Sequence, residues 1–306
     1  MTDAALVINE VKKAIVGKDL VLVKALLAIL AGGHILLEDI PGVGKTTMAL
    51  AFSKALGLEY NRVQFTPDVL PSDITGYSVY NSATGEMNYR PGAVLCNLFL
   101  ADELNRATSR TQSALLEAME EGQVTVDGVS RKIPKPFIVI AAQNPAGAKG
   151  TQLLPDSQLD RFMVRLSIGY PEHEDELEML KRRQSGEKEN VRQVTDAAGL
   201  IAMQSQVKQI FVKDSVLEYI VSLTEATRAH PGILQGASPR GTIALTEMAK
   251  ALAYVHGRDY VRPMDVSEMF ETVITHRLIF SPKGAGQEEQ IIEEILKATS
   301  MPRYSR

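Results

Sequence analysis

The first two-thirds of the chain alternates short apolar runs with longer segments in which apolar residues recur at helical spacing. The apolar runs predict buried parallel strands, and the longer segments predict helices. The predicted strands are 34–37, 61–65, 96–101, 137–142 and 163–168. The predicted helices are 6–14, 20–30, 46–56, 109–121 and 172–183. Strands that alternate with helices are typical of an α/β fold, in which helices cover both faces of a parallel sheet.

Two segments interrupt this alternation. The stretch 71–91 contains two short β-like pieces around a turn-rich cluster at 81–85. The stretch 124–131 is predicted to be a hairpin, because Asp127-Gly128 at its centre is a strong turn signal. Protruding hairpins of this kind are either surface decoration or the parts with which ring-shaped motors grip a substrate. The sequence alone leaves both interpretations open.

A polar stretch at 186–190 precedes a C-terminal region of different character. The pattern there is almost wholly helical, with predicted helices at 197–207, 214–229, 240–257, 263–276 and 288–297. We therefore expect a core domain at 1–188 and a small all-α domain at 189–306.

Residues 36–47 read Leu-Leu-Glu-Asp-Ile-Pro-Gly-Val-Gly-Lys-Thr-Thr. A strand that leads through a glycine-rich turn into a helix can bind phosphate, because backbone N–H groups and the positive end of the helix dipole face the anion. Lys45 is expected to reach the β- and γ-phosphates, and the Thr46 hydroxyl to bind Mg²⁺. The predicted nucleotide-binding residues of this loop are Pro41, Gly42, Val43, Gly44, Lys45, Thr46 and Thr47.

Asp39 stands where the strict phosphate-loop pattern has glycine. Asp is one of the few other residues that tolerate a left-handed backbone, so the departure weakens the match without destroying it. The alternative is an ordinary glycine turn between a strand and a helix.

The apolar run 97–101 ends in Asp102 and Glu103. This pattern predicts a buried strand whose carboxyl end faces a cleft. Asp102 is suited to hold Mg²⁺ through water, and Glu103 to polarise an attacking water. An isolated strand that ends in two acids is usually just solvated, but behind a phosphate loop the pair predicts a nucleoside triphosphatase.

Three further polar residues are candidates for catalysis. Asn144 follows a strand, and its amide can donate to phosphate and accept from water; the alternative is an Asn that begins a turn. Arg161 precedes the last strand, where it would reach a neighbour's site in a ring; the alternative is a surface ion pair with Asp160 or Glu172. Arg240 opens a helix from which a closing lid could touch the γ-phosphate, unless it is an ordinary exposed arginine.

Composition narrows the functional classes. A net charge of −4 gives no basic footprint for nucleic acid. The single Cys96 cannot form an internal disulfide and is predicted to be a buried thiol, and the five histidines lack metal-ligand spacing. The longest apolar stretch, 21–31, is too short to span a membrane, and the first residues lack the basic start of a signal peptide. We therefore expect a cytoplasmic protein.

Seven motifs occur in order along the chain. They are Glu-Asp-Ile-Pro-Gly-Val-Gly-Lys-Thr at 38–46, Phe-Thr-Pro-Asp at 65–68, Asp-Glu-Leu-Asn-Arg-Ala at 102–107, Thr-Gln-Ser-Ala-Leu-Leu-Glu-Ala-Met at 111–119, Gln-Asn-Pro at 143–145, Leu-Asp-Arg-Phe at 159–162 and Ser-Pro-Arg at 238–240. This set resembles the MoxR-type AAA+ ATPases over nearly the whole chain, and Asp in place of the first glycine is common in that family.

The resemblance implies a three-layer αβα core with strand order 5-1-4-3-2, a helical lid and a hexameric ring that uses ATP and Mg²⁺. It implies that Asn144 is the first sensor, Arg161 the finger that acts on a neighbouring subunit and Arg240 the second sensor. Val16 and Gly17 resemble the segment that lines the adenine pocket. The stretch 71–91 resembles the helix-2 insert of this clade, and about 123–134 resembles its hairpin before the first sensor.

The resemblance favours a chaperone-like remodeller or maturation factor for protein clients, often with a partner that contains a von Willebrand factor A domain. Arg106 and Arg110 are candidates for a subunit interface. The alternative is a helicase-like ring motor that translocates nucleic acid. Only Arg131 and Lys132 near the hairpin favour it, and the acidic charge counts against it. A nucleotide-dependent scaffold is disfavoured by Glu103.

Overall fold

A five-stranded parallel sheet forms the centre of the protein, for which a computed structural model describes residues 3–144, 154–185 and 190–303. The strands are β2 (Tyr60–Gln64), β5 (Leu98–Asp102), β8 (Ile138–Gln143), β1 (Ile35–Glu38) and β9 (Val164–Leu166), in that order across the sheet. Numbered among themselves along the chain and read from the β9 edge, they follow the predicted order 5-1-4-3-2, which is confirmed.

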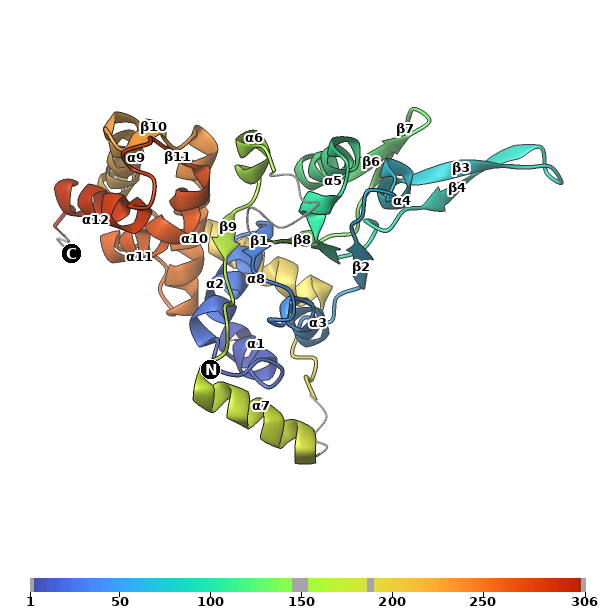
Figure 1. Ribbon diagram of the computed structural model, residues 1–306, viewed down its shortest axis with the longest axis horizontal. Coiled ribbons are helices and arrows are strands. Elements are labelled where there is room, and N and C mark those ends of the chain that lie inside the picture. The colour runs from blue at the N-terminus through green and yellow to red at the C-terminus, as the bar shows by residue number, and fades with distance from the viewer. Residues whose placement is uncertain (1–2, 145–153, 186–189, 304–306) are drawn as a thin grey trace.

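Helices cover both faces of this sheet, which makes the predicted three layers (Figure 1). Alternate residues of β1 belong to different apolar clusters: Ile35 and Leu37 to one, and Leu36 to the other. The first face packs against α1 (Asp3–Val11), α2 (Asp19–Leu30) and α3 (Lys45–Ala55), and the second against α5 (Ser109–Glu121). Strands buried on both faces must be continuously apolar, which is why the sequence pattern found them.

Both predicted interruptions of the core are antiparallel hairpins. The first follows the short helix α4 (Pro71–Thr75) and consists of β3 (Gly76–Asn81) and β4 (Glu86–Pro91), which project far from the sheet (Figure 1). The second consists of β6 (Gln123–Val126) and β7 (Val129–Lys132). Its turn residues Asp127 and Gly128 both have positive φ, at 53° and 74°, as the Asp-Gly signal requires.

The C-terminal region is helical with one small sheet. Its helices are α8 (Ala197–Gln209), α9 (Asp214–Ala229), α10 (Pro239–Val255), α11 (Pro263–Ile274), the 3₁₀ turn η2 (Thr275–Arg277) and α12 (Glu288–Ala298). The expected all-α domain therefore needs a correction, because β10 (Ile233–Gln235) pairs with β11 (Ile279–Phe280). Strands of two and three residues are too short to show an alternating pattern.

The remaining elements are the 3₁₀ turn η1 (Leu104–Arg106), α6 (Asp156–Leu159) and α7 (His173–Ser185), which follow β5, precede β9 and follow β9, respectively. Helices α8 and α10 pack against α2, so one apolar cluster runs from the sheet into the lid. The predicted domain boundary at 188/189 lies outside the described residues and stays a prediction.

Two further expectations from the sequence concern the single cysteine and membrane spans. Cys96 is buried, as predicted, and burial raises the pKa of its thiol to about 12. Within the described ranges, no helix combines the length and apolar character that a membrane span requires.

Candidate nucleotide site

The carboxyl ends of β1, β5, β8 and β2 meet at one edge of the sheet, around a cavity of about 380 Å³. Most of the predicted phosphate-site residues line it together with two that the sequence analysis did not single out: Pro41, Gly42, Gly44, Lys45, Thr46, Thr47, Arg62, Gln64, Asp102, Glu103 and Asn144. Val43 instead packs against the apolar cluster under α3. The two halves of the predicted triphosphatase site therefore do come together.

The phosphate loop has the backbone shape that its glycines allow. Gly42 and Gly44 have φ of 91° and 99°, a region that residues with a Cβ rarely enter. Helix α3 begins directly after Gly44, so its first N–H groups face the cavity. The Lys45 ammonium is buried and donates to the Asp39 carbonyl at 2.6 Å. Burial lowers the pKa of Lys45, while the charge of Asp39 opposes that shift.

The explanation of Asp39 by a left-handed backbone is wrong. Among the described residues, the only non-glycine positions with positive φ are Glu103 and Asp127. What Asp39 contributes is its side chain. Its buried carboxylate accepts hydrogen bonds from the Ser167 hydroxyl at 2.8 Å and from the N–H groups of Ile168 at 2.6 Å and Gly169 at 3.1 Å. Asp39 thus fastens the phosphate loop to the segment that follows β9.

The two acids after β5 have different surroundings. Asp102 accepts from an Arg62 guanidinium nitrogen at 2.7 Å. Glu103 has a left-handed backbone, with φ of 54°, and pairs with Arg106 at 2.9 Å. Asn144 Nδ2 donates to the same carboxylate at 3.4 Å. Burial alone would raise the pKa of Glu103, but the hydrogen bonds from Arg106, Asn144 and Gln64 outweigh it and lower the pKa. Glu103 is therefore held as a carboxylate.

Asn144 lies where its predicted role requires. It follows β8, which is the strand between β5 and β1. Asn105 Nδ2 donates to its carbonyl oxygen at 3.1 Å and fixes the backbone. The side-chain oxygen Oδ1 is buried and has no hydrogen-bond partner. A buried acceptor without a partner is costly, and a water molecule bound beside Glu103 would satisfy it.

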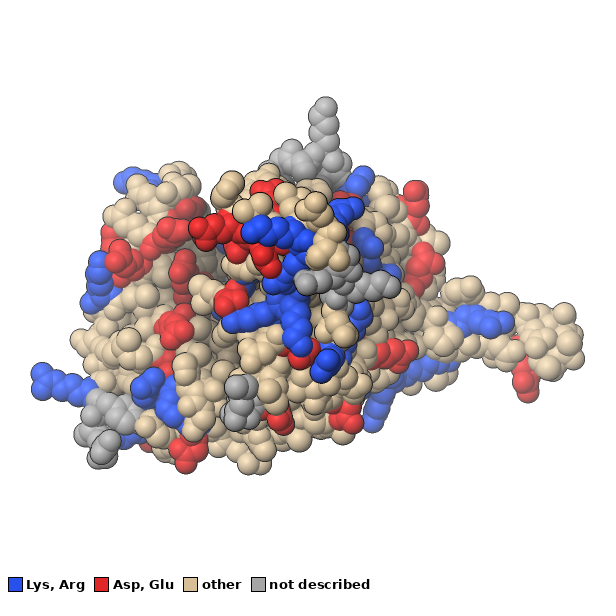
Figure 2. All heavy atoms as spheres, turned by 90° about the horizontal axis from the view of Figure 1, so that it is seen from below, with Lys and Arg blue, Asp and Glu red and all other residues tan. Residues whose placement is uncertain are grey.

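Val16 and Gly17 do not line the phosphate cavity. Gly17 has a φ of 72°, and a Cβ there would overlap the Asp175 carboxylate of α7. Val16 borders a separate cavity of about 880 Å³ between α1 and α7, together with Lys and Arg side chains. Lys and Arg side chains gather around α7 on the face shown in Figure 2. The adenine-binding role of Val16 and Gly17 stays a prediction.

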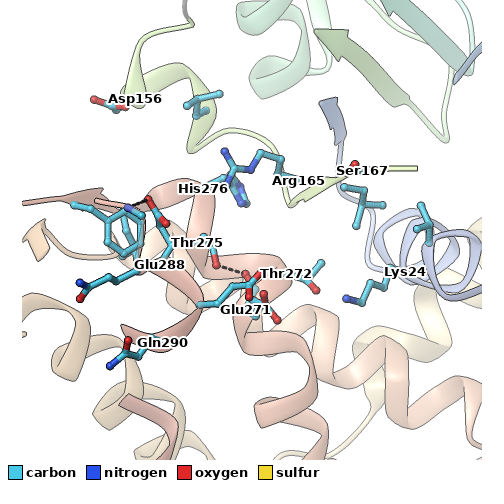
Figure 3. Close-up of a pocket in the computed structure, with 18 of the residues that line it drawn as sticks. Lys24, Asp156, Arg165, Ser167, Glu271, Thr272, Thr275, His276, Glu288 and Gln290 are labelled. Atoms are coloured by element: carbon cyan, nitrogen blue, oxygen red, sulfur yellow. Dashed lines mark hydrogen bonds between the residues drawn. The ribbon is translucent and has the colours of Figure 1, made fainter. Parts of the chain in front are cut away.

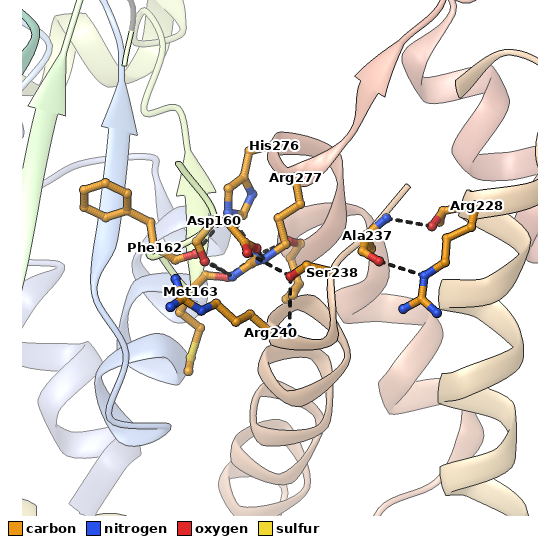
Figure 4. Close-up of polar contacts among 11 residues, drawn as sticks. Asp160, Phe162, Met163, Arg228, Ala237, Ser238, Arg240, His276 and Arg277 are labelled. Atoms are coloured by element: carbon orange, nitrogen blue, oxygen red, sulfur yellow. Dashed lines mark hydrogen bonds and ion pairs between the residues drawn. The ribbon is translucent and has the colours of Figure 1, made fainter. Parts of the chain in front are cut away.

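Arg161 and Arg240 lie at the opposite edge of the sheet. Arg161 precedes β9, which runs parallel to β1, whereas the phosphate loop follows β1. Both arginines form ion pairs with Glu120 of α5: Arg161 at 3.1 Å on Oε2, and Arg240 on Oε1. Within the described part of the chain, Arg161 forms no ion pair with either predicted alternative partner, Asp160 or Glu172; the Asp160 carboxylate instead binds Arg277 at 3.0 Å (Figure 4).

The sequence analysis missed Arg62, Gln64 and Glu120. Arg62 and Gln64 are two residues apart on β2 and opposite Leu100 and Asp102 of β5, so strand periodicity could have placed them beside the acids. Glu120 offered no such signal, because an acidic residue in a helix is usually solvent-exposed.

The arrangement agrees with the known proteins that this chain resembles. Residues 34–164 match the ATPase family associated with various cellular activities (AAA), and residues 225–295 match the AAA lid domain. The chain is 37% identical to the chaperone MoxR1 of Mycobacterium tuberculosis, over 97% of this chain and 82% of that protein. The chain belongs to the MoxR family of AAA ATPases.

Two further similarities cover almost the whole MoxR-type chain. It is 45% identical to YeaC of Bacillus subtilis, over 96% of this chain and 93% of that protein. The crystal structure of a candidate ATPase from Cytophaga hutchinsonii superposes with a TM-score of 0.90 at 36% identity, and covers 98% of this chain and 95% of that one. Since the family is an ATPase family, this MoxR-type protein binds ATP, and the cavity at the carboxyl edge is the candidate site for it.

The Asp39 carboxylate gives the first testable prediction. Asp39→Gly restores the strict glycine pattern but removes three hydrogen bonds to a buried charge, so we expect the free energy of unfolding to fall by about 2–4 kcal/mol. We also expect ATP to bind about tenfold more weakly, because the loop loses its attachment to the segment after β9.

Both quantities are measured by thermal unfolding and by titration with a fluorescent ATP analogue. Glu38→Gln is the control and should be nearly neutral, because it removes the charge that pairs with the partly exposed Arg165 and keeps an amide oxygen that can accept from Gln143. A stable Asp39→Gly protein that binds ATP at least as tightly as the natural chain would contradict this account.

Proposed function

We propose that this MoxR-type ATPase works as a hexameric ring in which each ATP lies between two subunits. The observation that supports this proposal is that Arg161 and Arg240 both form ion pairs with Glu120 at the amino edge of the sheet. The subunit's own phosphate loop is at the carboxyl edge of the same sheet. AAA ATPases are typically oligomeric, and in a ring the amino edge of one subunit can face the phosphate loop of the next.

Hydrolysis would follow from the groups that line the cavity. Glu103 would orient the attacking water and accept its proton, and Asn144 Oδ1 would hold that water from the other side. Lys45 would leave the Asp39 carbonyl for the β- and γ-phosphates. The water oxygen would attack the γ-phosphorus, the bond between the γ-phosphorus and the β–γ bridging oxygen would break, and ADP and inorganic phosphate would leave. Arg161 of the neighbouring subunit would stabilise the charge that develops on the γ-phosphate oxygens.

The residues present fit a magnesium ion that enters with the nucleotide. In the described part of the chain, no group of three or more His, Cys, Asp or Glu side chains could hold a metal by itself. Mg²⁺ typically binds through one or two protein oxygens plus the phosphates of a nucleotide. The Thr46 hydroxyl would supply one such oxygen directly, Asp102 would hold the ion through water, and the ion would neutralise charge on the β- and γ-phosphates. Asp102 must then exchange Arg62 for this ion.

We further propose that protein clients are the substrate on which the ring acts. A relative of this chain is named a chaperone, MoxR1. The projecting β3–β4 hairpin exposes the apolar side chains of Tyr77, Val79, Tyr80 and Met87, which suit contact with an unfolded polypeptide (Figure 1). A protein with a von Willebrand factor A domain as partner rests on the resemblance alone, and a cytoplasmic location rests on the expectation from the sequence.

The surroundings of Arg131 in the β6–β7 hairpin give little support to a motor that translocates nucleic acid. Arg131 stacks over the Tyr89 ring at 3.8 Å, and its guanidinium donates to the carbonyl oxygens of Val126 at 3.2 Å and Val129 at 3.0 Å. An arginine with these internal partners holds the two hairpins together. It would have to give up these contacts before it could bind a phosphate backbone.

The second prediction concerns Arg161. Arg161→Ala should reduce ATP turnover by about 10³–10⁵, as expected for an arginine finger, while ATP affinity is unchanged. Steady-state hydrolysis and titration with a fluorescent ATP analogue separate the two effects. Lys45→Ala provides the contrast, since it should abolish binding itself. Normal turnover by Arg161→Ala would contradict the assignment of this residue.

The third prediction separates the two substrate classes. A permanently unfolded polypeptide should stimulate ATP hydrolysis, whereas single-stranded DNA should not bind in a salt-sensitive way. The double variant Tyr80→Ser/Met87→Ser should lose the stimulation and keep the basal rate, because both residues lie on the projecting hairpin, far from the phosphate cavity. Tight, salt-dependent DNA binding without polypeptide stimulation would favour the translocase instead.

A further inference from the structure

The segment in front of β9 is held by one side chain of the lid. Arg277, in the 3₁₀ turn after α11, reaches across to this segment (Figure 4). Its Nε donates to Asp160 Oδ1 at 3.0 Å, its Nη2 to the Phe162 carbonyl at 2.6 Å and its Nη1 to the Met163 carbonyl at 3.1 Å. The residue next to Asp160 in the chain is Arg161. One guanidinium thus binds the side chain of the residue before Arg161 and the backbone of the two residues after it.

Arg277 is itself rigidly placed. It is buried, with 7% of its surface exposed, and its Nη1 also donates to the Val273 carbonyl of α11. Burial lowers the pKa of Arg277 to about 10, and Asp160 opposes that shift, so the side chain is a cation at neutral pH. A buried cation whose donors are used in this way has little freedom to move.

Asp160 links Arg277 to the helix that bears Arg240. The second carboxylate oxygen, Oδ2, accepts from the Ser238 hydroxyl at 2.8 Å. Ser238 is the N-cap of α10, and its Oγ accepts from the N–H of Arg240 at 3.1 Å. The same carboxylate therefore has Arg277 on one oxygen and the start of the Arg240 helix on the other.

Two cavities border this contact. A cavity of about 1040 Å³ lies on one side of it, lined by His276, Arg165 and Glu271 among others (Figure 3). A second cavity of about 270 Å³ lies on the other side, and Arg161, Arg240 and Arg277 all border it. At the Asp160 contact itself, hydrogen bonds from Arg277 and Ser238 join the segment that bears Arg161 to the lid.

We propose that Arg277 is a positioning residue that holds Arg161 and Arg240 as one unit, so that both enter the neighbouring subunit's ATP site together. The proposal rests on the proposed function, in which Arg161 acts across the subunit interface. Arg277 does not touch ATP. It acts through the Asp160 carboxylate and the backbone of Phe162 and Met163, and it couples movement of the lid to movement of the finger.

Two variants test the proposal. Arg277→Lys keeps the positive charge but cannot bind Asp160 and two carbonyl groups at once, and Asp160→Asn weakens the same contact from the other side. We expect kcat to fall about tenfold to a hundredfold in both, since a misplacement of about 1 Å is enough for such a loss. ATP affinity should stay unchanged, because the phosphate cavity is at the opposite edge of the sheet.

Arg258→Lys is the matched control. Arg258 is also a partly buried arginine of the lid and binds Asp265 through two hydrogen bonds of 2.6 and 2.7 Å, but it lies away from the finger segment. Its kcat should remain close to that of the natural chain. An equal loss of kcat in Arg258→Lys and Arg277→Lys would reduce the effect to general lid stability and overturn the proposal.

Mixed rings separate a positioning role from damage within the subunit. Glu103→Gln subunits cannot hydrolyse ATP but can supply intact arginines to a neighbour. Mixing them with Arg277→Lys subunits should restore hydrolysis, because the Arg277→Lys sites then receive a correctly placed finger. Arg161→Ala subunits, mixed with Glu103→Gln subunits in the same way, test the shared ATP site of the proposed function itself.

Rescue of both variants supports the proposal. Rescue of Arg161→Ala alone would overturn the role of Arg277 and leave the shared site intact. If neither variant is rescued, the shared site fails, and the role of Arg277 fails with it.

Discussion

In a parallel sheet every strand points the same way, so the loops that follow strands and the loops that precede them lie at opposite edges. The phosphate loop, Asp102 and Asn144 all follow strands, and Arg161 precedes one. This constraint separates the candidate ATP cavity from the two arginines that are proposed to act on the transition state. No side-chain rotation within one subunit can cross the sheet, and the proposed ring follows from that separation.

Ion pairs occupy the charged groups at both edges. At the carboxyl edge, Arg62 and Arg106 pair with Asp102 and Glu103. At the amino edge, Glu120 pairs with both Arg161 and Arg240. Each of these charged groups therefore already has a partner of opposite charge. In the proposed ring, ATP, Mg²⁺ or a neighbouring subunit would bind the same groups. Nucleotide binding and subunit docking would then each require an exchange of partners.

The sequence was sufficient to predict the parallel sheet and the residues that line the phosphate cavity from the loop and from the ends of β5 and β8. Continuous apolar strands and the spacing from Pro41 to Thr47 are local signals, and they located the strands to within a few residues. The role of Asp39 was misjudged because its partners, Ser167 to Gly169, lie almost 130 positions away. Arg277 escaped notice for the same reason, since its contact with Asp160 spans 117 positions. Links of this length leave no pattern in one sequence.

The most direct test of the shared site is the specific ATPase rate measured against protein concentration, with the particle size determined in parallel. A ring in which each site needs a neighbour's arginine predicts a specific rate that rises with concentration as a ring-sized species forms. A specific rate that is constant from a monomer upward would contradict it, because each subunit would then hydrolyse ATP without Arg161 of another.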